Sequence, residues 1–471
     1  MGILTGLAAA LLATACSCPC GAQISASPDG HYVAHKGRVL MLIGDSGTQC
    51  VTQNTNLDYR AWIDDCAARG IPMVHVWSFM APRQKQDGSL LEKRWGYVYP
   101  GVTPWARRDG GPPAADQLPC WDLRRFDDGG DDDLDRYWPR MRDLCRYARG
   151  KGLVVGITVF TGWAKYPENW DFHPLNRQNG GHLGKVSEAV LIDSPGSEVW
   201  RENWSDDWSG PRKTQWVWER FSHELLEQLN PFGNVFFVFL DEHSYDEGNM
   251  GDHFRDFFKK RGALWMDWEN RRDGVDFVYS DTLHHADTNR QAVEGFMGRP
   301  ARPHFLLEGE PYQGPEVRTS IWTFSMGGGH FTFHADEGME IPQRGIMGYD
   351  PHVAGGDRNM GIRDWLGHAA RFFNRELRNL DRMAPHNELT DGNTCCLACP
   401  GVEYAVYSKR DAPAGFRINL AGAAGTLFTA RFYDPATGTF SESFDVAGGG
   451  ETEFTKPGTE DWVLHLLADS R

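Results

Sequence analysis

Two short apolar runs in this chain end abruptly at acidic residues. The first, Val235–Leu240, is followed by Asp-Glu at 241–242, and the second, His304–Leu307, by Glu-Gly-Glu at 308–310. Continuous apolar runs of this length, rich in β-branched and aromatic residues, are typical of strands buried on both faces of a parallel sheet. In a β/α barrel the active site lies at the C-terminal rim of such strands. The two runs therefore predict carboxylates at a barrel rim, the arrangement that glycoside hydrolysis uses.

The segments around these runs alternate between strand-like and helix-like patterns from residue 24 to residue 385. After a short β-hairpin at 24–38, we expect eight strands, at residues 39–43, 72–79, 153–160, 235–240, 275–280, 292–296, 305–307 and 330–334. We expect helices at residues 57–69, 134–149, 199–229, 253–261 and 361–380. This order predicts an α/β fold, a (β/α)8 TIM barrel, with the two acidic-ended runs as strands four and seven.

The pattern changes after residue 386. Strand-like segments at 404–407, 416–420, 427–433 and 462–467 are separated by Gly, Pro and Asp turns. No helical spacing intervenes, so residues 386–471 are expected to form a small all-β sandwich. A chain of 471 residues has room for a barrel and such a module.

The N-terminal 22 residues have the composition of a targeting signal. The apolar segment 3–15 leads into Ala13-Thr14-Ala15-Cys16, which resembles a bacterial lipoprotein signal with lipidation at Cys16. Cleavage after Ala22 without lipidation is the alternative, and a buried first helix is a third reading. We therefore expect export, as a cell-surface or periplasmic lipoprotein or as a secreted protein. No later stretch is long and apolar enough to span a bilayer.

Charge and motifs exclude several partners. The formal net charge of −16 argues against nucleic acid, since phosphate binding needs concentrated Lys and Arg. No phosphate loop, dinucleotide fingerprint or zinc-protease motif occurs, so no cofactor is expected. The acidic run 127–133 is a more natural helix-capping loop than a Ca²⁺ site, and the acids near 241–247 lack metal-ligand spacing. The cysteines at 395–399 suggest a local disulfide in a loop, because export permits disulfides and zinc-ligand spacing is absent.

Several short motifs resemble clan A-type glycoside hydrolases of the apiosidase-like group, glycoside hydrolase family 140 and its relatives. These enzymes join a barrel to a C-terminal domain labelled "collagen-binding". Leu42-Ile43-Gly44-Asp45-Ser46 resembles the group's first strand, residues 307–312 (Leu-Glu-Gly-Glu-Pro-Tyr) its seventh, and residues 322–330 its glycine-rich entry to the eighth. Residues 430–438 and 461–464 resemble the C-terminal domain's signature. The loops at about 80–130 and 161–195 match nothing in the group and are expected to determine the substrate.

The resemblance implies roles for the carboxylates. Clan A enzymes retain the sugar's configuration, with the acid/base after strand four and the nucleophile after strand seven. Carried over, Glu242 is the acid/base and Glu310 the nucleophile, about 5 to 5.5 Å apart. Asp241 stands where relatives have Asn or Gly, so it remains an alternative to Glu242. Glu308 shares its parity with Glu310 and remains an alternative nucleophile.

Other polar and aromatic residues at strand ends and in the loops are candidates for substrate binding, since sugar sites bind hydroxyls and stack rings on Trp. They are Asp45, His75, Trp77, Trp163, His173, Asn176, His284, Trp322 and His334. For each of them a plain structural role is the alternative.

These observations predict an exported, retaining hydrolase of a plant or microbial polysaccharide. A polysaccharide lyase is a second enzymatic reading, but it would leave Glu310 without a role. A carbohydrate-binding or adhesive protein with an inactive barrel is the reading from a different class, and the presence of both carboxylates argues against it. Endo or exo action, the sugar and the oligomeric state are not determined by the sequence.

Overall fold

The computed structural model describes residues 24–46, 51–55, 57–79, 102–161, 170–183, 213–241, 248–280, 288–307, 309, 315–334 and 361–469. Eight parallel strands close into a barrel: β4 (Ile43–Asp45), β5 (Met73–Trp77), β8 (Val154–Thr161), β9 (Val235–Asp241), β10 (Trp265–Trp268), β11 (Phe277–Ser280), β12 (His304–Leu306) and β13 (His330–Phe333). Within this barrel β9 is the fourth strand and β12 the seventh. The predicted TIM-barrel fold, followed by an all-β module, is confirmed.

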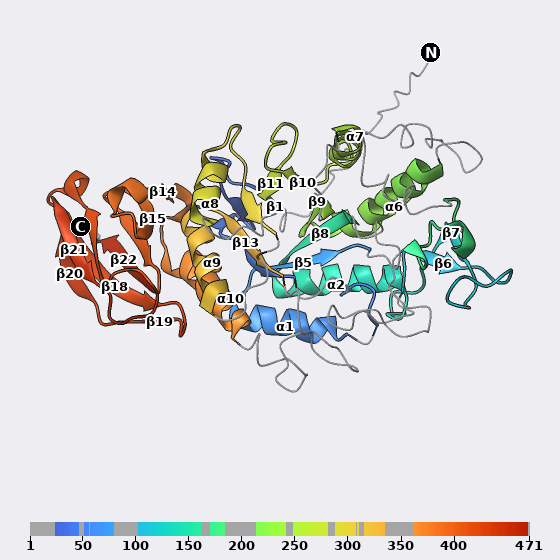
Figure 1. The fold of residues 1–471 in the computed structure, drawn as a ribbon, viewed down its shortest axis with the longest axis horizontal. Helices are drawn as coiled ribbons and strands as arrows, with labels where there is room; N and C mark the ends of the chain where they lie inside the picture. The colour runs from blue at the N-terminus through green and yellow to red at the C-terminus, as the bar shows by residue number, and fades with distance from the viewer. Residues whose placement is uncertain are drawn as a thin grey trace, which may run out of the picture.

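Helices surround the barrel (Figure 1): α1 (Tyr59–Arg69), α2 (Tyr137–Lys151), α6 (Lys213–Leu229), α7 (Gly248–Lys259), α8 (Thr288–Met297), α9 (Pro315–Met326) and α10 (Ile362–Arg371). Local chemistry sets their ends. Asp58 caps α1 by accepting a hydrogen bond from the Ala61 amide, and Gly70, with a φ of 82°, ends it in the left-handed conformation. The helix expected at 361–380 continues from α10 only as a π-helical turn, Phe372–Glu376.

One of the eight predicted strands is a helix, and one strand was missed. Residues 275–280 contain the sixth strand, not the fifth, because the short strand β10 had been overlooked. Residues 292–296, expected to be a strand, lie in helix α8, where Ala292, Gly295 and Phe296 face the core at helical spacing. The two errors cancel, so β9 and β12 keep their predicted places as strands four and seven.

The N-terminal residues form a small antiparallel sheet rather than a two-stranded hairpin. Its strands are β1 (Ile24–Ala26), β2 (Val33–His35) and β3 (Arg38–Leu40), so the run expected as one strand at 39–43 is divided between β3 and β4. Tyr32 from this sheet meets the His330 ring edge-on at 6.3 Å and donates a hydrogen bond to the Met383 carbonyl. The sheet therefore covers the N-terminal end of β13.

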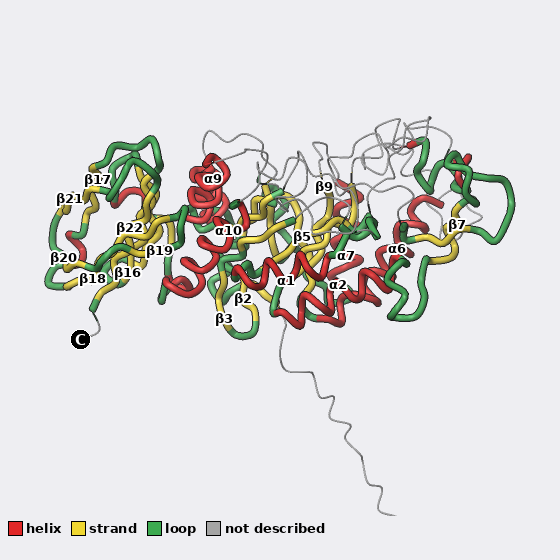
Figure 2. Tube along the Cα trace, turned by 90° about the horizontal axis from the view of Figure 1, so that it is seen from below, coloured by secondary structure: helices red, strands yellow, loops and turns green. Residues whose placement is uncertain are grey.

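The C-terminal module is all β. Its main sheet contains β14 (Ala384–Pro385), β15 (Thr394–Cys399), β16 (Glu403–Ser408), β22 (Trp462–Ala468), β18 (Leu427–Asp434), β19 (Thr439–Phe440) and β20 (Phe444–Ala447). A second pair, β17 (Gly415–Asn419) and β21 (Glu451–Thr455), completes it. The module lies beside α9 and α10 (Figure 2), at the opposite end of the molecule from the antiparallel pair β6 (Trp105–Arg107) and β7 (Trp121–Phe126) (Figure 1).

The prediction of a local disulfide at 395–399 was wrong. These three cysteines lie on strand β15, where successive side chains point to opposite faces. Cys396 packs in the module's own core, whereas Cys395 and Cys399 face the barrel side. Residues four apart on one strand are roughly 13 Å apart, far beyond disulfide reach, so no pair among the three can be bonded.

A buried contact joins the two parts. Trp322 of α9 stacks on Tyr407 of β16, with a ring-centroid distance of 6.0 Å. Beside it, Arg318 of α9 forms a bidentate ion pair with Asp461, and Tyr407 donates a hydrogen bond to the same carboxylate at 3.1 Å. Helix α9 is thus in contact with both the barrel and the module.

Candidate active site

The C-terminal ends of β9 and β12 are at the barrel rim, as expected for strands four and seven. β9 ends at Asp241 and β12 ends at Leu306. Glu242, Glu308 and Glu310 lie outside the described residues, as does the side chain of Asp241. The same holds for Trp163, His284 and Cys16.

Side chains on β9 alternate between the two faces of the barrel wall from Phe236 to Phe239. Phe236 and Val238 pack in the barrel interior with Met73 and Val154, whereas Phe237 and Phe239 pack between the wall and the helices. Phe236 and Val238 therefore face inward, whereas Leu240, near the end of the strand, clusters with the outward-facing residues. The alternation follows from the pleat of an extended chain.

The end of β12 departs from regular register. Leu306 pairs with Phe331, and the Gly309 amide donates to the Thr332 carbonyl at 2.9 Å, one residue off the straight continuation of that pairing. Leu307 packs in the barrel interior, but a side chain at 309 would meet the ring of Phe331 on the helix side. The shift is that of a β-bulge, a feature found at barrel rims beside active sites. Glycine is required here because the Phe331 ring occupies the space of a Cβ.

Three predicted binding residues gather at the inner rim. The Trp77 ring lies 4.7 Å from the His75 ring and 4.9 Å from the His334 ring, measured between centroids. His75 Nε2 is 2.8 Å from Thr158 Oγ1 on the neighbouring strand. Burial, together with the smaller effect of the nearby His334, lowers the pKa of His75 to about 3. His75 is therefore neutral at ordinary pH and can act only as a hydrogen-bonding group.

Further polar groups near this rim were missed by sequence reasoning. Thr158 and Thr332 are buried and alternate with outward-facing residues on β8 and β13. Within the described part of the chain, His75 Nδ1, Thr332 Oγ1 and Trp268 Nε1 are buried without a hydrogen-bond partner. Buried polar atoms normally have a partner, so these three are candidates to bind water or substrate hydroxyls. His75 was predicted from the sequence; the signal that could have found Thr158, Thr332 and Trp268 is the two-residue alternation counted back from the strand ends.

Asp45 has a structural role instead of the predicted substrate contact. Its carboxylate is fully buried and accepts hydrogen bonds from Trp62 Nε1 and from Arg363 Nε, both at 2.9 Å. It shares the outward parity of Ile43, which packs against the helices. The ion pair therefore connects the end of β4 to helices α1 and α10.

His173 and Asn176 belong to a compact loop. His173 Nδ1 accepts a hydrogen bond from the Leu175 amide at 3.0 Å, and its ring stacks on Trp170. Asn176 donates to the Trp170 carbonyl and accepts from the Gln178 amide. Both side chains are buried, and burial lowers the pKa of His173 to about 3. These hydrogen bonds stabilise the loop, so both side chains have a structural role.

Trp322 was predicted to contact sugar, and the structure corrects this. Its indole is fully buried on α9, on the outside of the barrel, among Tyr407, Phe372 and Phe373. A ring enclosed by the core between barrel and module has no face to offer a substrate. The glycine-rich resemblance that suggested Trp322 covers the approach to β13 rather than its C-terminal end.

The acidic run at 127–133 forms ion pairs and a helix cap. Asp127 accepts a hydrogen bond from the Tyr137 amide at the start of α2, and Asp131 lies 2.9 Å from Arg142 and 2.8 Å from Arg146. Within the described residues no group of three or more His, Cys, Asp or Glu side chains is placed to hold a metal ion. No described helix is both long and apolar enough to cross a membrane.

Solved structures with this arrangement include glycoside hydrolases. One is described as a glycoside hydrolase, with a TM-score of 0.62 and 13% identity over 96% of this chain and 98% of that chain. Another, a glycoside hydrolase family 5 protein from Bacteroides vulgatus, has a TM-score of 0.62 and 12% identity over 95% and 93%. At such identity the likeness shows a shared fold along nearly the whole chain.

Sequence comparison is informative only for the C-terminal module. The family model described as "Putative collagen-binding domain of a collagenase" matches residues 386–467. No curated protein matches the chain in sequence. The module therefore resembles a known domain, whereas the barrel is related to solved structures through its fold.

Proposed function

We propose that this protein is an exported glycoside hydrolase that cleaves a plant or microbial polysaccharide with retention of configuration. The observation that carries the proposal is the barrel order, in which the two acidic-ended strands are the fourth and the seventh. Those are the strands that carry the carboxylate pair in clan A enzymes, which the sequence motifs resemble. The shared fold with solved glycoside hydrolases agrees with the proposal.

In this proposal Glu242 is the acid/base. Up to Val238 the inward positions of β9 are even-numbered, whereas the even-numbered Leu240 clusters with the outward-facing residues. Parity therefore does not choose between Asp241 and Glu242, and we assign the acid/base to Glu242 because its position matches the family pattern. For the seventh strand, Glu308 and Glu310 share one parity, so parity alone does not separate them. We assign the nucleophile to Glu310 because its sequence neighbours resemble the family pattern.

The chemistry then follows two steps. The Glu310 carboxylate attacks the anomeric carbon as Glu242 protonates the departing oxygen, which gives a covalent glycosyl-enzyme and releases the aglycone. Glu242, now ionised, takes a proton from water as that water attacks the anomeric carbon and displaces Glu310. Neutral His75 and the hydroxyl of Thr332 are proposed to bind sugar hydroxyls beside the pair, and the fully buried Trp77 to support the rings of His75 and His334.

The test is sugar release from a panel of polysaccharides and aryl glycosides by the wild type and by Glu242→Gln and Glu310→Gln. Both variants should lose at least about 10³-fold in kcat, whereas the matched neighbours Asp241→Asn and Glu308→Gln should retain most activity. Azide should rescue Glu242→Gln on an activated aryl glycoside, giving a glycosyl azide of retained configuration, but should not rescue Glu310→Gln. An active Glu310→Gln variant, or a first-formed product of inverted configuration, would refute the assignment.

We also propose that residues 1–22 direct export, with lipidation at Cys16, and that residues 24–385 and 386–471 are the catalytic and accessory domains. The support is the signal-like composition before Cys16 and the change from barrel to all-β strands. Membrane fractionation checks the anchor: the wild type should sediment with membranes, and Cys16→Ala should not. A soluble wild type of unmodified mass would contradict lipidation.

A further inference from the structure

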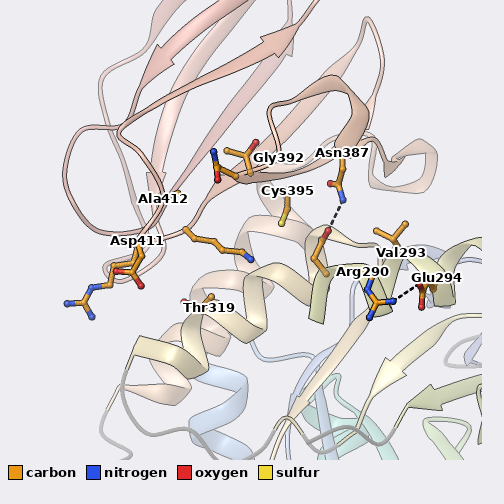
Figure 3. Close-up of a pocket in the computed structure, with 14 residues that line it drawn as sticks. Arg290, Val293, Glu294, Thr319, Asn387, Gly392, Cys395, Asp411 and Ala412 are labelled. Atoms are coloured by element: carbon orange, nitrogen blue, oxygen red, sulfur yellow. Dashed lines mark hydrogen bonds and ion pairs between the residues drawn. The ribbon is translucent and has the colours of Figure 1, made fainter. Parts of the chain in front are cut away.

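A cavity of about 590 Å³ lies between the barrel helices and the C-terminal module. Residues of α8 and α9 form one wall, and the segments 387–395 and 409–412 form the other (Figure 3). None of the lining residues belongs to a barrel strand, so this cavity is distinct from the candidate active site. Its volume is that of ordinary ligand pockets, which occur preferentially between domains.

The wall of the cavity is held in place by side-chain amides. Asn387 Nδ2 donates to Asn289 Oδ1 at 2.7 Å, across the two parts of the protein (Figure 3). The other end of each amide is also bonded, since Asn387 Oδ1 accepts from the Cys396 amide and Asn289 Nδ2 donates to the Thr323 carbonyl. The cavity therefore has a defined shape.

The charged side chains that line the cavity differ in whether a described carboxylate lies within ion-pair distance. Arg290 lies 3.1 Å from Glu294, and Arg410 lies 3.6 Å from Glu460. Lys409 is half-buried, yet no carboxylate of the described chain lies within ion-pair distance of its ammonium group. A partly desolvated cation is stabilised most by a carboxylate that accepts its hydrogen bonds.

The backbone that carries Lys409 is anchored. Lys456 is buried and donates from Nζ to the carbonyls of Lys409 at 2.8 Å and Arg410 at 3.1 Å. The turn therefore presents the Lys409 side chain from a fixed position. Such preorganisation lowers the entropic cost of binding.

We propose that this cavity binds a short oligosaccharide that carries carboxylates, a uronate oligomer. A carboxylate would pair with Lys409, and sugar hydroxyls would bind the Asn393 amide and donate to Asp411. The lining favours this class, because Lys409 can pair with a carboxylate while the Asn393 amide and the Asp411 carboxylate can donate to and accept from sugar hydroxyls. The inference goes beyond the proposed catalytic function, since it assigns a second site built from both parts of the chain.

Calorimetric titration of the full chain with trigalacturonate tests this site. The Glu310→Gln variant serves as the background, so that turnover cannot consume the ligand. Lys409→Gln should weaken binding about tenfold or more, because one charge-assisted hydrogen bond is lost while side-chain length and polarity are largely kept. The matched control is Arg417→Gln, an exposed cation on β17 outside the cavity lining, which should bind like its parent.

Three outcomes of the sugar titrations would overturn the proposal. They are absence of trigalacturonate binding, equal affinity in Lys409→Gln and its parent, and equal affinity for a neutral trisaccharide. A triaspartate peptide titrated in parallel must bind more weakly than trigalacturonate, since tighter binding would assign the site to acidic peptides. The readout does not depend on catalysis, so its failure is distinguishable from failure of the proposed hydrolase activity.

Discussion

The ion pair between Arg318 and Asp461 makes a quantitative prediction about how the two parts of the protein hold together. Its side chains are 5% and 1% exposed, and the Asp461 carboxylate accepts hydrogen bonds from the guanidinium and from Tyr407. Removing the carboxylate leaves a buried guanidinium whose remaining contacts include the half-exposed Glu460, 3.3 Å away, and the ring of Trp365. We therefore expect Asp461→Ala to lower the free energy of unfolding by about 3–5 kcal/mol.

The double variant Arg318→Met/Asp461→Ala separates the cost of an unpaired charge from the value of the pair. Because replacing both charges removes the buried cation, it should recover at least about 2 kcal/mol of the single variant's loss. The matched control is Glu451→Ala, which breaks the exposed pair with Arg417 and should cost less than about 1 kcal/mol.

Urea unfolding at pH 7, followed by tryptophan fluorescence, measures these differences. The reasoning is refuted if Asp461→Ala lies within 1 kcal/mol of the wild type (about the range of an exposed pair), or if the double variant is no more stable than the single one. Either result would mean that Arg318 reaches water or another acceptor at little cost.

Three further predictions follow from buried groups. Burial raises the pKa of Glu403, but hydrogen bonds from His465, Asn379 and the backbone outweigh it and hold this pKa below its usual value. The ionised carboxylate therefore stabilises the fold above about pH 4.5, and this stabilisation is lost as the pH falls. The difference in urea midpoint between the wild type and Glu403→Gln should accordingly narrow from pH 5 to pH 3. Burial lowers the pKa of His173 to about 3 in the folded protein, against about 6.5 in the unfolded chain. The stabilising contribution of the neutral ring therefore declines below pH 6.5, by about 2 kcal/mol at pH 5. The His173→Asn variant keeps an acceptor for the backbone amide and should lose less stability than the wild type between pH 7 and pH 5. Trp322→Ala should lower the free energy of unfolding by about 3–5 kcal/mol while leaving KM unchanged, and a raised KM would restore Trp322 to the substrate site.

The sequence was informative where burial is uniform along a strand. β9 and β12 are buried on both faces, so their apolar runs are continuous and end where the barrel ends. β10 was missed because the charged Asp267 interrupts a four-residue run. Residues 292–296 were mistaken for a strand because Ala, Val and Phe in so short a window fit the spacing of a strand as well as that of a helix. The choice becomes clear only when the segment is extended to Thr288, the first residue of a ten-residue helix.

The roles of single side chains were harder to predict, because parity and tertiary partners determine them. Asp45 follows a strand at the predicted rim, yet its odd parity places it against Trp62 and Arg363. Trp322 is aromatic and near a resembling motif, but it lies on a helix that packs against the module. By contrast, His75 and Trp77 share the inward parity of β5, and the structure brings them next to His334.

The position of α9 gives the C-terminal module a structural role in this protein. The helix begins at Pro315, shortly after the seventh strand, and its outer face is covered by β15 and β16 of the module. Arg318 and Trp322, one turn apart, bury a charge and an indole that would face water if the module were absent. The module therefore stabilises the helix that follows the strand proposed to carry the nucleophile, and a binding role for it would be added to this structural one.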